Sequence, residues 1–426
     1  MLNLKYIQDN PQEVIDKLKI KNFEATEIVG GIIKLYQEKN VVQAEADNAK
    51  AKMNTIAKEI GKFMQSGLKS EADEAKTQTA ELKEQIKNLD TKFAELDAKL
   101  MELAIKLPNI PSSLVLAGKS ADDNEIVKEG GVMPKLTDAK PHWDIAKEYD
   151  LIDFELGVKI TGAGFPVYKG QGAKLQRALI SFFLDEATKA GYTEIMPPLM
   201  VNEASGYGTG QLPDKDGQMY HATEDGLYLI PTAEVPVTNI YRDVIVDESS
   251  LPVKNCAYSA CFRREAGSYG KDVRGLNRLH QFDKVEIVQI ARPDMSYNIL
   301  DQMVAHVEGL VNKLELPYRI LRLCGGDLSF TSALTYDFEV FSAAQEKWLE
   351  VSSVSNFESF QANRMKLRYR DSQTKKTVVA HTLNGSAIAL PRIVAALLEN
   401  NQTSEGIRLP KALVPYFGAE MIRVRP

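Results

Sequence analysis

The chain has 426 residues, of which 44% are hydrophobic and 26% charged, values that are ordinary for a globular protein of two or three domains. The formal net charge of −6 excludes a global positive field, so any binding of nucleic acid must use local basic stripes. No apolar run approaches the roughly 20 residues that span a bilayer, and the first residues do not form a secretory signal.

The cysteine and histidine content limits the redox and metal chemistry. Cys256, Cys261 and Cys324 form no CxxC pair and no disulfide framework, which fits a reducing cytoplasm. The five histidines are scattered and make no HxxxH pair, so we expect no zinc site. We therefore expect a cytoplasmic protein without a membrane segment.

Residues 1–110 are expected to form a helical N-terminal domain. Asn10-Pro11 predicts the start of a short helix that ends near Lys19. Apolar residues then recur with alternating spacings of three and four from Ile28 to Phe63, and again from Ala72 to Leu107. Because Gln65-Ser66-Gly67 separates the two heptad series, they predict an antiparallel coiled-coil hairpin with arms of about 55 Å.

Residues 111–140 are expected to be a linker, since they are rich in Pro, Gly, Ser and Asp, with one short strand near Glu125 to Lys128. Residues 141–426 then alternate helices and strands. Helices are predicted at 175–190, 296–314 and 388–399, with strands at 318–323, 336–341, 348–353, 365–371 and 377–382. Within 191–201, the first helix is expected to run into a strand that ends at proline. This order, without a GxxxxGK[ST] loop, favours an α+β fold in which helices flank an antiparallel sheet.

The stretch from Tyr258 to Ile290 carries the strongest chemical pattern. It predicts a hairpin of strands 258–264 and 279–290 around a charged, glycine-containing loop. The period of two places Cys261, Arg263 and Glu265 on one face of the first strand. On the second strand it places Phe282, Lys284 and Glu286 on one face. Arginine suits phosphate oxygens, an aromatic ring offers a face to a base, and a carboxylate can hold an ammonium group.

Five runs of sequence resemble one known family. FRREAGSYGKDVRGLNRLHQFDKVE (262–286) resembles motif 2 of class II aminoacyl-tRNA synthetases in the form carried by seryl-tRNA synthetases. LIPTAEVP (229–236) resembles the loop that closes over the amino acid, and EVSSVSNF (350–357) the strand that holds magnesium. HTLNGSAIALPR (381–392) resembles motif 3, and the helix and strand of 175–201 resemble motif 1, which builds the dimer interface in this family.

The resemblance implies a serine–tRNA ligase that works in two steps. L-serine and ATP would give seryl-adenylate and pyrophosphate, and the serine would then pass to the 3′-terminal adenosine of tRNA(Ser), with tRNA(Sec) left open as a second acceptor. In this family the N-terminal hairpin grips the long variable arm of the tRNA. The resemblance also implies a homodimer that uses Mg²⁺.

The site residues implied by the resemblance fall into three groups. Arg263 and Arg392 would be the catalytic residues, which stabilise charge on the phosphates. Serine would be bound by Thr232, Ala233, Glu234, Arg263, Glu286, Asn384 and Ser386. ATP would be bound by Arg263, Arg264, Glu265, Phe282, Glu350, Val351, Ser352, Ser353 and Arg392, with Glu350 and Ser353 as ligands of Mg²⁺, a cation that prefers oxygen donors.

Several alternatives remain at this point. The chain could be another class II synthetase, a synthetase-like homologue that activates an amino acid for a carrier other than tRNA, or a coiled-coil scaffold protein. The N-terminal hairpin and the HTLNGSA string argue against the first two, and the scaffold would leave Arg263, Glu286, Glu350 and Arg392 without a shared purpose.

Overall fold

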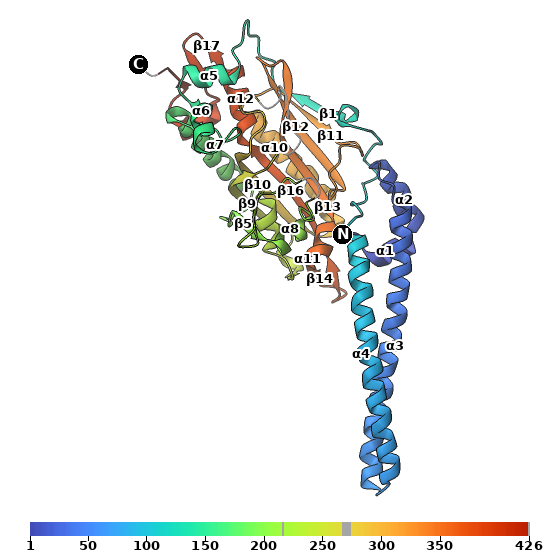
Figure 1. Cartoon of the computed structure of the whole chain (residues 1–426). Helices are drawn as coiled ribbons and strands as arrows, with labels where there is room; N and C mark the ends of the chain where they lie inside the picture. The colour runs from blue at the N-terminus through green and yellow to red at the C-terminus, as the bar shows by residue number, and fades with distance from the viewer. Residues whose placement is uncertain (215–216, 266–273, 425–426) are drawn as a thin grey trace. The chain divides into compact units, whose positions relative to one another are not determined.

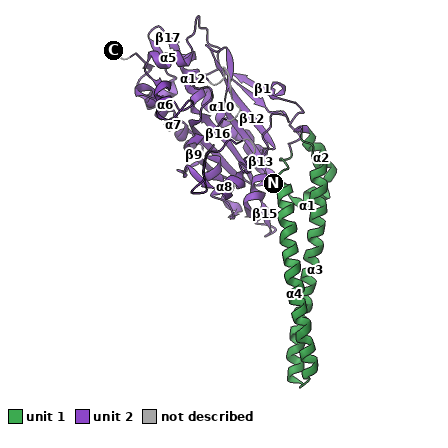
Figure 2. Cartoon of the chain, viewed as in Figure 1, with its two compact units in different colours: residues 1–19, 23–110 green, residues 20–22, 111–426 purple. Residues whose placement is uncertain are grey.

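The computed structural model describes residues 1–214, 217–265 and 274–424. The chain divides into two compact units, coloured separately in Figure 2: unit 1 contains Met1–Lys19 and Phe23–Ile110, and unit 2 contains Ile20–Asn22 and Pro111–Pro426. Within the expected motif 2, residues 266–273 lie outside the described residues. No described helix is both long and apolar enough to cross a membrane.

Unit 1 is a helical hairpin with two short helices before it. The helices are α1 (Leu4–Asp9), α2 (Pro11–Ile20), α3 (Thr26–Gln65) and α4 (Lys69–Ala104). Pro11 begins α2 as the sequence predicted, whereas α1 was not predicted. In α1, the Asn3 side chain accepts a hydrogen bond from the backbone of Tyr6 and so caps the helix.

Helices α3 and α4 lie side by side along their length and form the predicted antiparallel pair, here called the arm (Figure 1). At 1.5 Å per residue, α3 spans about 60 Å. Small and apolar side chains such as Ala46, Ala72 and Leu100 fill the seam. Lys39, at an expected heptad core position, lies over the Phe93 ring and pairs with Asp97 across the seam at 2.7 Å. Lys50 and Asp90 also pair between the two helices, at 2.9 Å, and both ion pairs are consistent with one alignment of α3 and α4.

Unit 2 is built on an eight-stranded, mainly antiparallel sheet, which confirms the predicted fold class (Figure 1). The spatial order of its strands is β1 (Glu125–Gly130), β11 (Tyr318–Arg322), β12 (Leu334–Ser342), β13 (Lys347–Glu358), β16 (His381–Ala389), β10 (Gln281–Ala291), β9 (Val253–Phe262) and β4 (Thr193–Glu194). Only the short β4 pairs in parallel with its neighbour within this sheet.

Smaller elements surround this sheet. The short strands are β2 (Ile152–Asp153), β3 (Val167–Tyr168), β5 (Met200–Asn202), β6 (His221–Ala222), β7 (Leu227–Leu229), β8 (Ile245–Asp247), β14 (Arg368–Arg370), β15 (Thr377–Val379), β17 (Gln402–Thr403), β18 (Gly406–Arg408) and β19 (Met421–Ile422). The helices are α5 (His142–Glu148), α6 (Phe154–Ile160), α7 (Gly170–Lys189), α8 (Glu203–Thr209), α9 (Glu234–Asn239), α10 (Ser296–Lys313), α11 (Phe360–Met365), α12 (Leu390–Asn400) and α13 (Val414–Phe417).

The main core lies on one face of the large sheet. Phe182 from α7, Val307 from α10 and Leu397 from α12 pack there against Val285 and Ile287 of β10. The alternate β10 residues point to the opposite face, where Val288 packs against Ala233 and Val237 beside α9. The helices of the main core therefore leave part of the second face of β10 available for a site.

Several predicted boundaries were wrong in detail. The strand predicted to follow residue 190 and to end at proline is only the short β4, and a second strand, β5, follows the prolines at 197 and 198, which lack the N–H that a ladder needs. Met365 ends α11 rather than starting a strand, and Ile388 still belongs to β16 rather than to the following helix. The hairpin of β14 and β15 forms as predicted, with Arg368 opposite Val379.

Candidate active site

The paired strands β9 and β10 set the floor of the candidate site. Phe282 lies opposite Cys261, Lys284 opposite Ser259, and Glu286 opposite Ala257. Lys284 and Glu286 thus share one face of β10, as the sequence predicted, whereas the Phe282 ring also packs against the main core. The result is a row of one aromatic ring, one ammonium group and one carboxylate along a single strand.

A buried polar cluster lies at the end of this row. The Lys284 Nζ is 2.6 Å from the Glu286 Oε2 and donates to the Thr232 Oγ1 at 2.8 Å. The Thr232 hydroxyl donates to the same Glu286 oxygen at 3.2 Å, and the Ser386 hydroxyl approaches that oxygen at 3.5 Å. All four side chains are buried. The cluster therefore holds one positive and one negative charge and two hydroxyl groups away from bulk water.

An irregularity in β16 brings Ser386 into this cluster. Lys284 pairs with Ala389 and Glu286 with Ser386, so β16 carries one more residue than β10 across the same span. Ile388 inside this bulge has φ of +87°, a conformation that is strained for a β-branched residue. Backbone strain of this kind persists where the surrounding structure holds it, and here it aims a hydroxyl at a carboxylate.

A second carboxyl, Glu234, lies beside the cluster. It is buried, and its Oε1 accepts a hydrogen bond from the Gln361 Nε2 at 2.6 Å. Burial, reinforced by the negative charge of Glu286, raises the pKa of Glu234 from 4.5 to about 7, against opposing contributions from Gln361, Lys284 and Asn384. Glu234 thus exchanges a proton near neutral pH, while Ala233 packs its methyl group in the small core beside it.

The raised pKa of Glu234 predicts a pH dependence of stability. Between pH 4.5 and about 7 the folded protein keeps a proton on this carboxyl that the unfolded chain releases. The protonated Glu234 carboxyl therefore contributes its full stabilisation of the folded state below about pH 4.5, and this contribution is lost as the pH rises through about 7. Relative to the parent, Glu234→Gln should gain up to ~3 kcal/mol of stability between about pH 5 and pH 8. Denaturant unfolding across this pH range measures the difference.

Glu286→Gln is the companion variant for this measurement. It removes the neighbouring charge that helps to raise the pKa of Glu234, so the loss of stability should move to lower pH. If the difference in free energy of unfolding between Glu234→Gln and the parent stayed constant with pH, the raised pKa of Glu234 would be contradicted.

Arg263 lies where β9 ends and is held from two sides. Its backbone N–H donates to the carbonyl of His280 at 2.9 Å, and its Nε donates to the carbonyl of Pro231 at 3.3 Å. Its guanidinium carbon lies 5.2 Å from the centre of the Phe282 ring. The site therefore places Arg263 over the aromatic ring and beside the loop that carries Thr232.

The two residues after Arg263 depart from the predicted strand pattern. β9 ends at Phe262, and Glu265 has φ of +50°, so the alternation does not extend to these positions. Arg264 is exposed, with its guanidinium 5.8 Å from the Tyr220 ring, and Glu265 accepts a hydrogen bond from Arg278 at 2.9 Å. Glu265 shares no strand face with Arg263, which corrects the prediction.

Arg392 lies at the start of α12, where Pro391 occupies the first turn and needs no hydrogen-bond partner for a backbone N–H. The Arg392 Nε donates to the carbonyl of Asn277 at 3.0 Å, and its Nη1 donates to the carbonyl of Glu350 at 2.7 Å. The same Nη1 is 3.6 Å from the Glu350 carboxylate. Three parts of the chain, around residues 277, 350 and 392, therefore meet at this guanidinium.

A polar hollow of about 670 Å³ opens beside Glu350. Its lining includes Glu350, Ser353, Asp337 and Glu339, which all offer oxygen atoms. Burial and the charge of Glu350 raise the pKa of Asp337 well above its usual range, although a hydrogen bond with Ser353 opposes the shift. Among the described residues, no group of three or more His, Cys, Asp or Glu side chains is arranged to hold a metal ion by itself.

The two residues between Glu350 and Ser353 point elsewhere. The Val351 side chain belongs to the main core, so only its backbone is available to a nucleotide. The Ser352 hydroxyl donates to the carbonyl of Ser386 at 2.5 Å and so links β13 to the neighbouring strand β16. Glu350, Ser353 and Ser355 are the members of the run 350–357 that line the hollow.

Sequence reasoning missed three residues of the site. Lys284 was placed on the correct face but was given no role, and the alternation between Phe282 and Glu286 was the signal that could have found it. Gln361 and Asp337 contact Glu234 and Ser353, respectively, from distant segments, and no sequence motif marked either of them.

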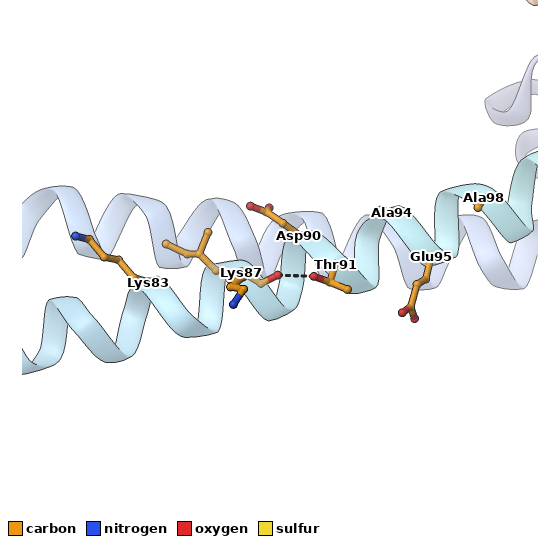
Figure 3. A pocket seen from close by; sticks show the side chains of 8 residues that line it. Lys83, Lys87, Asp90, Thr91, Ala94, Glu95 and Ala98 are labelled. Carbon is orange, nitrogen blue, oxygen red and sulfur yellow. Dashed lines mark hydrogen bonds between the residues drawn. The ribbon is translucent and has the colours of Figure 1, made fainter.

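The arm carries a second surface of interest on α4. Lys83, Lys87 and Thr91 lie along one stretch of this helix with Asp90 and Glu95, over a shallow hollow that Ile86, Ala94 and Ala98 also line (Figure 3). The Thr91 hydroxyl donates to the carbonyl of Lys87 at 2.9 Å. Two lysines one turn apart lie here beside two acidic residues, so this surface offers single positive groups rather than a continuous basic stripe.

Comparisons with known proteins identify the family. Residues 1–111 match the seryl-tRNA synthetase N-terminal domain, and residues 219–401 match the tRNA synthetase class II core domain (G, H, P, S and T). The chain is 49% identical over 420 residues to a serine–tRNA ligase of Salinibacter ruber, with 98% of each chain covered. The chain belongs to the seryl-tRNA synthetase family.

Solved structures agree with this assignment. The crystal structure of a seryl-tRNA synthetase from Pyrococcus horikoshii, complexed with ATP, matches with a TM-score of 0.92 and 33% identity and covers both chains completely. A cytoplasmic serine–tRNA ligase from Naegleria fowleri, in complex with AMP, matches with a TM-score of 0.87 and 25% identity over 100% of this chain and 99% of that one. The protein is thus an aminoacyl-tRNA synthetase with the activity of a serine–tRNA ligase, and the carrier-loading and scaffold alternatives are not favoured.

Proposed function

We propose that the buried cluster of Thr232, Lys284, Glu286 and Ser386 is the serine subsite. The observation that carries this assignment is the Lys284 ammonium, which lies within hydrogen-bond distance of both Glu286 and Thr232. An ammonium group is already the ligand of this pair. The ammonium of L-serine has the same chemistry, so it takes this place, while the serine hydroxyl is bound by the remaining oxygens of the cluster.

The displaced Lys284 ammonium then needs a new partner. The serine carboxylate supplies it, because it enters the same small pocket with the opposite charge. Glu234 and Asn384 complete the pocket on one side. Alanine is rejected because it leaves the buried oxygens without the substrate hydroxyl, a loss worth on the order of 10⁴-fold in discrimination.

Thr232 gives a direct test of the subsite. Thr232→Val keeps the shape of the side chain but removes the hydroxyl that contacts Lys284 and Glu286. The KM for serine should rise roughly 10- to 100-fold, as expected for hydrogen bonds to charged groups, while the KM for ATP changes little. Pyrophosphate exchange at varied serine concentration measures both constants.

Thr232→Ser is the matched control, since it retains the hydroxyl and loses only a methyl group. Its KM for serine should stay within a few-fold of the parent value. If Thr232→Ser and Thr232→Val raised this constant equally, the hydroxyl would have no part in substrate binding.

For ATP we propose that Arg263 contacts the α-phosphate, Arg392 the γ-phosphate, and Phe282 the adenine. An oxygen of the serine carboxylate attacks the α-phosphorus, and the bond to the β-phosphate breaks with its electrons retained by pyrophosphate. Because the carboxylate is ionised at neutral pH, this step requires no general base. It requires alignment and stabilisation of phosphate charge, which the two guanidinium groups provide. Glu265 contributes to the nucleotide subsite from the end of β9.

We propose that Mg²⁺ is held by Glu350 and Ser353. Both side chains face the polar hollow, and Glu350 is half-exposed, so phosphate and water oxygens can complete the ligand set. This donor set of oxygens fits a hard cation. When bound, Mg²⁺ supplies neutralisation of phosphate charge.

The partners of the chain follow from its two units. We propose that the arm binds the long variable arm of tRNA(Ser), and that the chain acts in the cytoplasm, which its three free, buried cysteines suit. We also propose a homodimer. Exposed apolar side chains at Met196, Leu199 and Met200 support it, since such groups mark interaction surfaces. Sedimentation equilibrium tests the dimer.

ATP–pyrophosphate exchange with each of the twenty amino acids, without tRNA, tests the proposal as a whole. Exchange that depends on serine alone is the expected result. Exchange with another amino acid would overturn the serine subsite, and no exchange with any of them would overturn the assignment of the catalytic groups.

A further inference from the structure

A buried histidine supports the end of the motif 2 loop from outside the matched domains. His142 is the first residue of α5, and it lies in the segment between residues 111 and 219 that neither family model covers. The described part of motif 2 resumes at Arg274 after the gap at residues 266–273. From there to Asn277 the loop lies against α5, and three successive residues make contacts with it.

The His142 ring is fully buried and both of its nitrogens are used. Its Nε2 accepts a hydrogen bond from the backbone N–H of Leu276 at 2.8 Å, and its Nδ1 lies 2.7 Å from the Glu399 Oε1. Since a backbone N–H can only donate, Nε2 carries no hydrogen, and the ring donates its Nδ1 hydrogen to Glu399. Burial would raise the pKa of Glu399, but hydrogen bonds from His142 and Ser342 lower it, so a carboxylate holds the ring in one orientation.

The two residues before Leu276 also fit closely against α5. Gly275 has φ of +65°, and a Cβ at this position would lie 2.2 Å from the His142 Nε2, so only glycine permits the approach. The Arg274 guanidinium lies 4.5 Å from the centre of the Trp143 ring. The end of the loop is thus fitted to two successive side chains of α5.

A ring of hydrogen bonds connects this contact to Arg392. The Gln345 Nε2 donates to the same Glu399 oxygen that His142 contacts, at 3.0 Å. The Asn277 Nδ2 donates to the Gln345 Oε1 at 2.8 Å, and the Asn277 carbonyl accepts the hydrogen bond from the Arg392 Nε at 3.0 Å. Both ends of the segment Leu276-Asn277 are therefore fixed, one by His142 and the other by Gln345.

The cluster does not have the arrangement of a hydrolytic triad, although it contains a serine, a histidine and an acid. The Ser342 hydroxyl donates to Glu399 rather than to the imidazole, and the His142 Nε2 is occupied by the Leu276 amide. No base is therefore available to activate the hydroxyl. The contacts of His142 serve position rather than nucleophilic chemistry.

We infer that His142 is a positioning residue for ATP binding, which acts through the Leu276 amide and the Asn277 carbonyl to hold the Arg392 guanidinium in place. The inference rests on the proposed role of Arg392 at the ATP phosphates. It assigns a function in the nucleotide subsite to a residue that contacts no substrate. A shift of about 1 Å in a phosphate-binding group can cost on the order of 100-fold, so the amide contact of His142 has a measurable effect on ATP.

Two substitutions at His142 distinguish the contributions of its two ring nitrogens, because each retains only one of their contacts. In His142→Gln the side-chain oxygen can reach the place of Nε2 and accept from Leu276. The contact of the side chain with Glu399 is lost, while the backbone N–H of residue 142 still donates to Glu399. In His142→Asn the amide nitrogen can take the place of Nδ1 and donate to Glu399, while the contact with Leu276 is lost. Glu399 keeps Ser342 and Gln345 as partners in both variants.

Pyrophosphate exchange with the full-length protein gives KM values for ATP and serine, and thermal unfolding gives the stability of each variant. We expect His142→Asn to raise the KM for ATP roughly 10- to 100-fold with the KM for serine within about 2-fold. His142→Gln should keep the KM for ATP within a few-fold of the parent, even if its thermal midpoint falls. A rise in both KM values for both variants, or an unchanged KM for ATP in folded His142→Asn, overturns the inference.

Gln345→Ala interrupts the same set of hydrogen bonds at a second place. Gln345 lies in a turn and is partly exposed, so this substitution disturbs the core less than a change at His142. It should also raise the KM for ATP but not that for serine, and an unchanged KM for ATP counts against the inference even if His142→Asn does not fold. Arg392→Ala distinguishes a failure of the proposed role of Arg392 from a failure of the inference about His142. If Arg392→Ala itself leaves the KM for ATP unchanged, the proposed role of Arg392 fails; if it raises this KM and folded His142→Asn does not, only the inference about His142 fails.

Discussion

Replacing Arg263 with alanine should abolish serine-dependent pyrophosphate exchange, with a loss of at least about 10³-fold in kcat/KM. Arg263 is held by the carbonyls of Pro231 and His280, and its guanidinium lies over the Phe282 ring. These contacts fix a permanent positive charge beside the proposed serine subsite, where we expect charge to develop on the α-phosphate. Its removal leaves that charge without a partner in a site of low dielectric constant.

Two companion variants sharpen this test. Arg264→Ala removes a neighbouring but exposed arginine and should reduce exchange far less. Arg263→Lys keeps the charge but loses the planar pair of donors, so it should recover only part of the activity. Circular dichroism should show an unchanged fold in all three variants. Normal exchange by Arg263→Ala would refute its role at the phosphate.

Removal of the arm should separate the two steps of the reaction. Excision of Leu35 to Leu100, with a short Gly-Ser linker, should leave pyrophosphate exchange near the parent level but reduce the charging of tRNA(Ser) roughly 10³-fold. The two ends of the excision lie close together on α3 and α4, as the nearby pair of Lys39 and Asp97 shows. The loss is of the size expected when several phosphate contacts disappear.

A charge variant of the intact arm is the control for this excision. Replacing Lys83 and Lys87 by glutamine keeps both helices but removes the positive groups seen on α4 (Figure 3). Charging should fall and become less dependent on salt, with exchange unchanged. Equal loss of exchange and charging after the excision would mean that the arm has only a structural role.

The arm and the central hairpin could be predicted because both depend on local periodicity. Heptad spacing predicted α3 and α4, and the alternation along β10 placed Phe282 and Glu286 on one face. The same alternation failed at Glu265, since β9 ends at Phe262 and the backbone turns to positive φ. Periodicity does not indicate where a strand stops when a functional loop follows it.

Other parts of the site could not be predicted, because they depend on contacts between distant segments. His142 and Glu399 are 257 residues apart, and no motif joins them. The bulge that directs Ser386 toward Glu286 is a property of the pairing between β10 and β16 rather than of either strand alone. Val351 was expected at the nucleotide, yet its position in β13 sends its side chain into the main core.

In the proposed serine subsite, the Lys284–Glu286 pair would make substrate entry an exchange of one ammonium group for another. Because Lys284 already pairs with Glu286, an incoming ammonium would gain only the difference between its own contacts and those that Lys284 gives up. An amine that lacks a carboxylate would leave the released lysine buried without a counter-ion. The proposed subsite would therefore select an amino acid over a simple amino alcohol before ATP takes any part, because only the amino acid offers Lys284 a carboxylate.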